Sequence, residues 1–316
     1  MNTIRSHSIE LILLGVLLLA IGYFAYLAYG LMPASRTDQP FSGSRSLENA
    51  RRLVNYGPRP VGSPANKKAG DWIIQYVTSQ GWDVVVQPFT ITNQIPAQNI
   101  IAIRSPATAD APVGLVVTHY DTRLVADNDP NPANRANPGV GANKGASGVA
   151  LLTELARTLD IEAGGLTICL AFFDAEENGG LPGWEPNIGS KLFLENLDRS
   201  AVRCAAPRFA IVVDLVGASQ VQIHPVGDDT PIGQAIRKVA GELGFAETFS
   251  TDLRQVQSNN TNWFLQQGTE SATIADTTYP FIDSLSDTLD KLDVESLDKV
   301  GQTLEVWLER GGDFTK

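Results

Sequence analysis

The stretch Val116–Gly148 constrains the fold most, because it joins a buried strand to a glycine-rich helix start. The apolar run Val116–Thr118 predicts a strand, and His119-Tyr120-Asp121 follows it directly. Side chains two positions apart on a strand point the same way, and open α/β sheets bind their ligands beyond the strands' carboxyl ends. A histidine and a carboxylate in this arrangement are typical of metal ligands.

The second part of the stretch, Pro138–Gly148, leads into a predicted helix from Ala146 to Leu159. Residues 141–145 should therefore face the same crevice from a helix N-terminus. A phosphate-binding loop is excluded, because the required G-K-[ST] is absent. Ser147 lies three residues after Lys144 and could form a Ser–Lys pair, but a serine at a helix start is more often a cap.

Short apolar strands and helices alternate along the rest of the chain, which predicts an α/β fold: a three-layer sandwich with a mixed, mostly parallel central sheet. Helices are expected from a Ser46 cap to Tyr56, from Pro64 to Ser79 and from Val294 to Glu309. The further strands are predicted at Val84–Phe89, Asn99–Ile103, Leu166–Phe173, Phe209–Leu215 and Ala272–Ala275.

The N-terminal run Leu11–Met32 is uncharged and long enough to span a membrane, for which about 20 apolar residues are needed. A cleaved signal peptide is the alternative, but its apolar region would be shorter, about 7 to 15 residues. We therefore predict a membrane anchor at residues 1–34, a linker at 35–45 and one domain at 46–316. The predicted location is single-pass membrane, with the domain on the extracytoplasmic side.

Charge and cysteine content narrow the partners and the compartment. The net charge of −11 argues against binding to phosphates, so nucleic acid is excluded as a partner. Cys169 lies in an apolar strand and Cys204 in a loop. Free thiols are the default expectation, and a bridge between the two remains open.

Carboxylates follow two further strands at the points where these strands end. Asp174-Ala175-Glu176-Glu177 comes after Leu166–Phe173, and Asp214 falls at the end of the strand that starts at Phe209. A buried carboxylate needs a cation, a hydrogen-bond donor or water. Together with His119 and Asp121, these acids predict a metal or acid–base centre at one edge of the sheet.

These motifs resemble the M28 zinc-peptidase family, and within it the glutaminyl-cyclase-like branch. The resemblance covers about residues 46–310. It rests on GPRPVGS (Gly57–Ser63), THYD (Thr118–Asp121), GANKGASGVALLTELAR (Gly141–Arg157), FFDAEE (Phe172–Glu177), GSKLF (Gly189–Phe193), VVDLVG (Val212–Gly217) and YPFIDSLSDTLDKL (Tyr279–Leu292).

The resemblance implies one or two zinc ions in this crevice. His119 and Asp214 match ligands of the first metal, and Glu177 matches a ligand of the second. Asp121 matches the carboxylate that orients the histidine, and Glu176 matches the general base.

Three positions depart from the family's pattern. The metal-bridging aspartate falls on Lys144, the last histidine on Asp283, and a late Asp-His pair on Asn260 and Thr261. A lysine ammonium cannot ligate zinc, and it repels a dication. The expected cofactor is therefore one zinc ion or none, and Asp283 is at most a doubtful ligand.

Two functions follow from this pattern. In the first, the domain is a degenerate member whose metal centre is replaced by a cluster of Lys144 and carboxylates, and it binds a peptide or protein N-terminus. In the second, it is an active metal-dependent aminopeptidase or glutaminyl-peptide cyclotransferase that uses a single remaining zinc ion.

Overall fold

The computed structural model describes residues 39–226, 229–254 and 268–314, together with Leu17, Ala20, Tyr23 and Phe264. Pro40–Lys316 forms one compact unit. The predicted anchor at Leu11–Met32 thus lies almost wholly outside the described residues. Within the described part, no helix is both long enough and apolar enough to span a bilayer.

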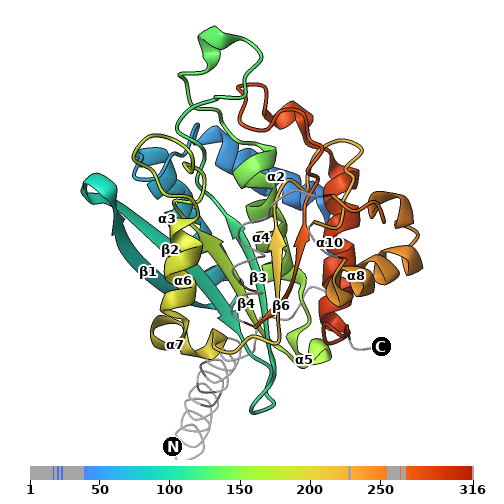
Figure 1. Ribbon diagram of the computed structural model, residues 1–316. Coiled ribbons are helices and arrows are strands. Elements are labelled where there is room, and N and C mark those ends of the chain that lie inside the picture. The colour runs from blue at the N-terminus through green and yellow to red at the C-terminus, as the bar shows by residue number, and fades with distance from the viewer. Residues whose placement is uncertain are drawn as a thin grey trace, which may run out of the picture. The chain divides into compact units, whose positions relative to one another are not determined.

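A sheet of six strands forms the centre of the unit Pro40–Lys316 (Figure 1). In spatial order the strands run β1-β2-β4-β3-β5-β6. β4, β3, β5 and β6 pair in parallel, whereas β1–β2 and β2–β4 are antiparallel, so the prediction of a mixed, mostly parallel sheet is confirmed. The strands are β1 (Asp83–Ile91), β2 (Ile95–Arg104), β3 (Val113–His119), β4 (Thr167–Phe173), β5 (Phe209–Val213) and β6 (Glu270–Ile274).

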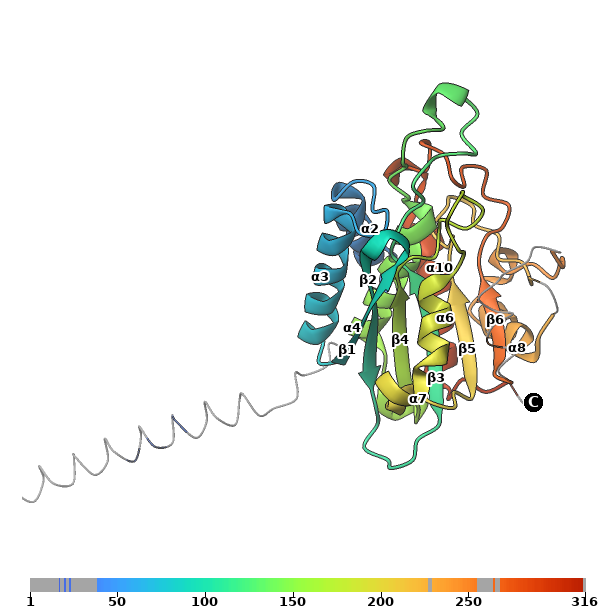
Figure 2. The ribbon, with the colours of Figure 1, turned by 60° about the vertical axis from the view of Figure 1, so that its left-hand side comes forward.

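Helices cover both faces of the sheet, as Figure 2 shows. The alternation of side chains along each strand explains the two cores: Val116 packs in one hydrophobic cluster, and its neighbours Leu115 and Val117 pack in another. The helices are α2 (Gly43–Asn55), α3 (Pro64–Ser79), α4 (Gly148–Thr158), α5 (Ile161–Gly164), α6 (Ile188–Glu195), α7 (Leu197–Ser200), α8 (Pro231–Glu242) and α10 (Val294–Glu309).

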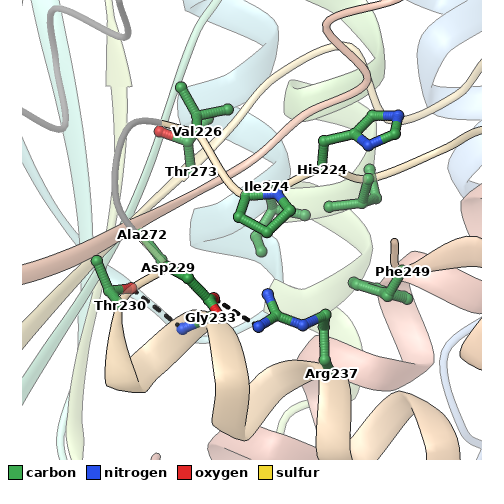
Figure 3. Close-up of a pocket in the computed structure, with 12 residues that line it drawn as sticks. His224, Val226, Asp229, Thr230, Gly233, Arg237, Phe249, Ala272, Thr273 and Ile274 are labelled. Atoms are coloured by element: carbon green, nitrogen blue, oxygen red, sulfur yellow. Dashed lines mark hydrogen bonds and ion pairs between the residues drawn. The ribbon is translucent and has the colours of Figure 1, made fainter. Parts of the chain in front are cut away.

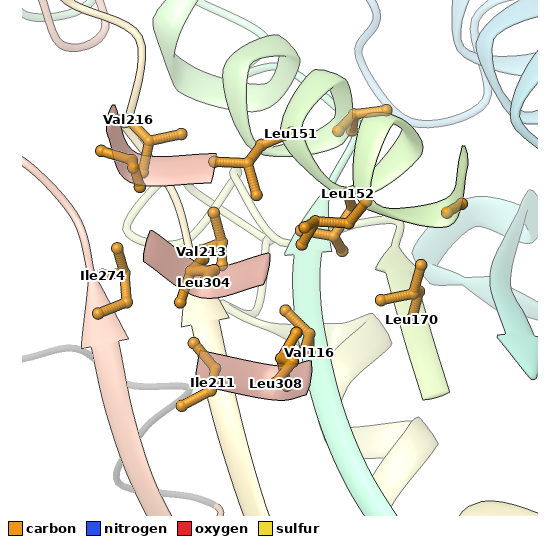
Figure 4. Close-up of a cluster of buried hydrophobic side chains, with 14 of the residues drawn as sticks. Val116, Leu151, Leu152, Leu170, Ile211, Val213, Val216, Ile274, Leu304 and Leu308 are labelled. Carbon is orange, nitrogen blue, oxygen red and sulfur yellow. The ribbon is translucent and has the colours of Figure 1, made fainter. Parts of the chain in front are cut away.

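The larger core lies between the sheet and helices α2, α3, α4, α8 and α10. Figure 4 shows Leu151 and Leu152 of α4 and Leu304 and Leu308 of α10 packed over Val116 and neighbouring strand residues. The smaller core contains Phe193 of α6 and lies on the other face. The strand ends that carry the site are therefore fixed from both sides.

Two expectations about local structure are wrong. Helix α2 begins at Gly43, and the side chain of Ser42 caps it, so it takes in residues assigned to the linker, while Ser46 is buried inside it. The free-thiol expectation also fails, because Cys169 of β4 and Cys204 form a disulfide. Both cysteines lie in the smaller core. They meet because the chain between them, which includes α6 and α7, folds back onto the sheet, and the sequence gives no local signal of this.

Candidate functional site

The ends of β3, β4 and β5 bring the predicted residues together. In the sheet register His119 lies beside Phe173, and Val117 lies beside Val212, so the residues that follow these strands emerge at one level. His119 Nε2 is 3.6 Å from Glu177 Oε1 and 3.5 Å from Asp214 Oδ1. One histidine thus faces two carboxylates delivered by two different strands.

Asp121 fixes the position of His119 and of the two glutamates. His119 Nδ1 lies 3.1 Å from the Asp121 carbonyl oxygen and 3.4 Å from Asp121 Oδ1. The other carboxylate oxygen, Oδ2, accepts hydrogen bonds from the backbone N–H groups of Glu176 and Glu177 at 3.0 and 3.1 Å. Asp121 thus contacts both the imidazole of His119 and the backbone of the two glutamates.

Lys144 points its ammonium into the carboxylates of the site. Its Nζ lies 2.6 Å from Glu177 Oε2 and 2.9 Å from Asp283 Oδ1. All three side chains are at most one-fifth exposed. Burial alone would lower the pKa of Lys144, but the charges of Glu177 and Asp283 outweigh it and raise that pKa well above its ordinary value, so the side chain is a cation.

The backbone around these side chains adopts conformations that residues with a Cβ rarely take. Ala175, Leu215 and Asp283 have φ values of 61°, 55° and 54°, and each is, or directly adjoins, a site carboxylate. Gly145, with φ of 97°, lies so close to Asp121 that a Cβ would come within 2.7 Å of its carbonyl oxygen. Such strain is common where a site must be held in one geometry.

Sequence reasoning missed Asp287, which holds the segment that carries Lys144. Asp287 Oδ1 accepts the N–H of Asn143 at 2.8 Å, and Oδ2 accepts the N–H of Lys144 at 3.1 Å. The hydroxyl of Tyr279 donates to the same carboxylate at 2.7 Å. Its place within the motif Tyr279–Leu292 was the signal that could have identified it.

Arg59 is the second residue that sequence reasoning missed. It is fully buried and donates to the carbonyl oxygens of Tyr120, Val140 and Gly141 at 3.1, 2.8 and 3.0 Å. Burial lowers its pKa to about 10, against the opposing effect of nearby Asp287. It joins the strand end after β3 to the glycine-rich loop, and its position in GPRPVGS pointed to such a role.

Glu176, the predicted general base, is held by helix α6. Its two carboxylate oxygens accept hydrogen bonds from the backbone N–H of Ser190 at 2.7 Å and from the Ser190 hydroxyl at 2.9 Å. Burial raises the pKa of Glu176 to about 7, although these two hydrogen bonds act in the opposite direction. Its carboxylate could exchange a proton near neutral pH, but it also accepts hydrogen bonds from Ser190 in the N-terminal turn of α6.

The remaining candidates lie elsewhere or have structural partners. The Ser147 hydroxyl donates to the Asn143 carbonyl at 2.6 Å and accepts the N–H of Val216, so no Ser–Lys pair forms. His224 is the other histidine among the described residues; Figure 3 shows it in a separate small pocket with Arg237, and no residue of the site lines that pocket. Asn260 and Thr261 lie outside the described residues.

The described residues do not fit a pair of zinc ions. No group of three or more His, Cys, Asp or Glu side chains in this part of the chain is arranged around a common metal position. His119 Nε2 is buried without a hydrogen-bond partner and would accept a metal. The position that the family resemblance gives to a bridging aspartate, however, holds Lys144, whose ammonium already pairs with Glu177.

A comparison with protein-family models places the strand ends of this site in a known family. The model of peptidase family M28 matches residues 99–308, which is more than half of the chain. The chain belongs to peptidase family M28. The match includes every strand-end residue described above, and the resemblance to the glutaminyl-cyclase-like branch is also confirmed.

Relatives within this M28 branch include glutaminyl-peptide cyclotransferase of Drosophila melanogaster, 25% identical over 71% of this chain and 64% of that protein. The glutaminyl-peptide cyclotransferase-like protein of Bos taurus is 28% identical over 53% of this chain and 48% of its own length. The chain thus spans less than two thirds of either curated relative.

Solved structures extend the similarity over most of the chain. Porphyromonas gingivalis glutaminyl cyclase is 26% identical with a TM-score of 0.75, covering 85% of this chain and 98% of that one. A Zn-dependent exopeptidase from Parabacteroides distasonis has a TM-score of 0.77 at 22% identity, covering 89% of this chain and 100% of that one. At 22% identity, the similarity to the exopeptidase shows a shared fold and nothing more.

Proposed function

We propose that this protein is a glutaminyl-cyclase-like M28 domain that binds peptide or protein N-termini and whose zinc site is impaired. The observation that carries the proposal is the Lys144 ammonium between Glu177 and Asp283. A protonated lysine has no lone pair for a metal. At about 4 Å it repels each unit of positive charge by about 4 kcal/mol at an effective dielectric constant near 20.

The same cluster suits a ligand that carries one positive charge. Lys144 compensates Glu177 and Asp283, whereas Asp214, the most exposed acid of the group at 23%, faces the His119 imidazole, with 3.5 Å between Oδ1 and Nε2. Its Oδ1 accepts the N–H of the adjoining Leu215, a contact that neutralises no charge. A peptide's α-ammonium complements this carboxylate, and the names of the curated relatives point to peptides as the ligand class.

A binding comparison of free and blocked peptides tests this proposal. A fluorescent peptide with a free N-terminus should bind the purified protein at least tenfold more tightly than the same peptide acetylated at its N-terminus. Asp214→Asn should remove most of this difference, while Asp71→Asn, on the exposed face of α3, should leave it unchanged. Equal affinity for the free and acetylated peptides would refute N-terminal recognition.

An active enzyme with one zinc ion is the second candidate, as an aminopeptidase or a glutaminyl-peptide cyclotransferase. Two ligands of one tetrahedral zinc ion lie about 3.4 Å apart. His119 Nε2 is at a similar separation from Glu177 and Asp214, 3.6 and 3.5 Å. The zinc content of the protein as purified separates this candidate from the first.

The proposed location is the outer side of a membrane, with residues 11–32 as the anchor. The disulfide between Cys169 and Cys204 supports an oxidising compartment, because cytosolic thiols are kept reduced. The proposed partners are the membrane and a peptide or protein N-terminus.

A further inference from the structure

Helices α2 and α3 carry an excess of positive charge on their outer faces, although the whole chain has a net charge of −11. Figure 2 shows the two helices together on one side of the sheet. Their charged residues are five cations and two acids: Arg45, Glu48, Arg51 and Arg52 of α2, and Lys67, Lys68 and Asp71 of α3. All five cations are exposed. A local net charge of this sign marks a surface for an anionic partner.

The two acids of these helices are already paired. Glu48 lies 3.3 Å from Arg51, and Asp71 lies 2.8 Å from Lys67. Within the described part of the chain, no carboxylate lies within ion-pair distance of Arg45, Arg52 or Lys68. These three exposed cations are therefore available to a partner, and we call them the cationic surface.

The cationic surface is continuous, because its members flank one row of aromatic rings. The Arg52 guanidinium lies over the Trp72 ring, 5.9 Å from its centroid, and the centroids of Trp72 and Tyr76 are 5.4 Å apart. Burial raises the pKa of Tyr76, and the charge of nearby Arg45 opposes this shift. Lys68 precedes Trp72 by four residues, so the two side chains are neighbours on α3.

The chain joins this surface at a fixed point. The backbone N–H groups of three consecutive residues, 41–43, donate at 3.0, 3.2 and 2.8 Å to carboxylates of α10 and α4, in the order Glu305, Glu154 and Asp298. The buried ring of Phe41 packs so closely on Gly301 that a Cβ there would come within 2.1 Å of it. Arg45 follows within the same turn of α2. The surface therefore starts beside the point where the chain enters the folded unit.

The proposed anchor ends a short way before this point. Seven residues, 33–39, separate Met32 from Pro40, and a chain of that length reaches at most about 25 Å. A short tether raises the effective concentration of the tethered group at its target to about the millimolar range. Basic residues that adjoin a membrane span are attracted to anionic headgroups. The tether and the charge thus favour the same partner.

We propose that the cationic surface docks on the anionic phospholipid headgroups of the membrane that holds the chain. Guanidinium groups, such as those of Arg45 and Arg52, bind phosphate oxygens in pairs, and the Lys68 ammonium adds a further charge. Each Lys or Arg near such a membrane favours the docked state about fivefold. The inference rests on the proposed membrane location and does not depend on what the carboxylate cluster binds.

The test measures how fast Lys68 is acylated by a water-soluble succinimidyl ester. The full chain is reconstituted in nanodiscs of phosphatidylcholine with or without phosphatidylglycerol, and modified lysines are quantified by mass spectrometry. Phosphatidylglycerol should slow the acylation of Lys68 at least about fivefold. Lys238, an exposed lysine of α8, should react at the same rate in both discs. High salt should remove the slowing, because it screens exposed charges.

Matched double variants separate the cationic surface from a general effect of charge. Arg45→Gln combined with Arg52→Gln should abolish the slowing of Lys68. Arg254→Gln combined with Arg310→Gln, two exposed arginines outside α2 and α3, should keep it. Equal rates in both discs, slowing that survives the first double variant, or slowing that is lost in the second, would overturn the docking while the anchor stands. If carbonate extracts the full chain from the membrane, the anchor is refuted, and the docking falls with it.

Discussion

Replacing Lys144 with methionine tests whether its ammonium holds the site together. The change removes the ammonium that pairs with Glu177 and Asp283, whose side chains are only 10% and 13% exposed. Removing one partner from a buried ion pair typically costs about 3 to 5 kcal/mol. We therefore expect the free energy of unfolding to fall by about that amount, measured by urea denaturation at neutral pH.

The matched control is Lys67→Met, which breaks an exposed pair with Asp71 and should cost less than about 1 kcal/mol. Adding Asp283→Asn to the Lys144→Met variant should restore part of the loss, because one unpaired charge is then removed. A loss below about 1 kcal/mol for Lys144→Met, at an unchanged denaturant slope, would refute the idea that this cluster stabilises the site.

Three further predictions concern the disulfide, the buried acid below the sheet edge and the anchor. Cys169→Ala together with Cys204→Ala should lower the free energy of unfolding by about 3 to 4 kcal/mol, because the bridge closes a loop of 35 residues; a thermal or urea melt checks this, and an unchanged melt contradicts it. Burial raises the pKa of Asp174 from 3.8 to about 7, so its contribution to stability is present at low pH and is lost as the pH rises toward 7. Asp174→Asn should therefore flatten the curve of unfolding free energy against pH between about 3.8 and 7, by at most a few kcal/mol. An unaltered curve would contradict this prediction. Full-length protein should stay with membranes through carbonate washing by way of Leu11–Met32, and a released form lacking residues 1–34 would rule out the anchor.

The sheet and the position of the site could be predicted because they depend on local patterns. Apolar runs ended by charged residues, as at His119 and Asp174, mark the carboxyl ends of buried strands. Once the strands are parallel neighbours, those ends must meet at one edge. The fold class and five of the site residues follow from that rule with little need for distant contacts.

The parts that could not be predicted depend on contacts between distant segments. Arg59 acts through carbonyl oxygens of the glycine-rich loop, and Asp287 acts through the backbone N–H groups of Asn143 and Lys144, which are 144 and 143 positions earlier in the chain. Neither contact leaves a periodic signal. The start of α2 was also missed, because Ser46 was expected to cap the helix, whereas the helix begins at Gly43 and the Ser42 side chain accepts the N–H of Arg45.

The zinc content of the purified protein tests the central claim most directly. The account predicts well under one zinc ion per chain in the natural protein, and about one per chain in Lys144→Asp combined with Asp283→His, which removes the ammonium and restores a carboxylate and an imidazole. The contrary result is a natural protein that purifies with one tightly bound zinc ion and shows a peptide-hydrolysing or cyclising activity that Glu176→Gln abolishes. That result would disprove the impaired zinc site and support the active enzyme.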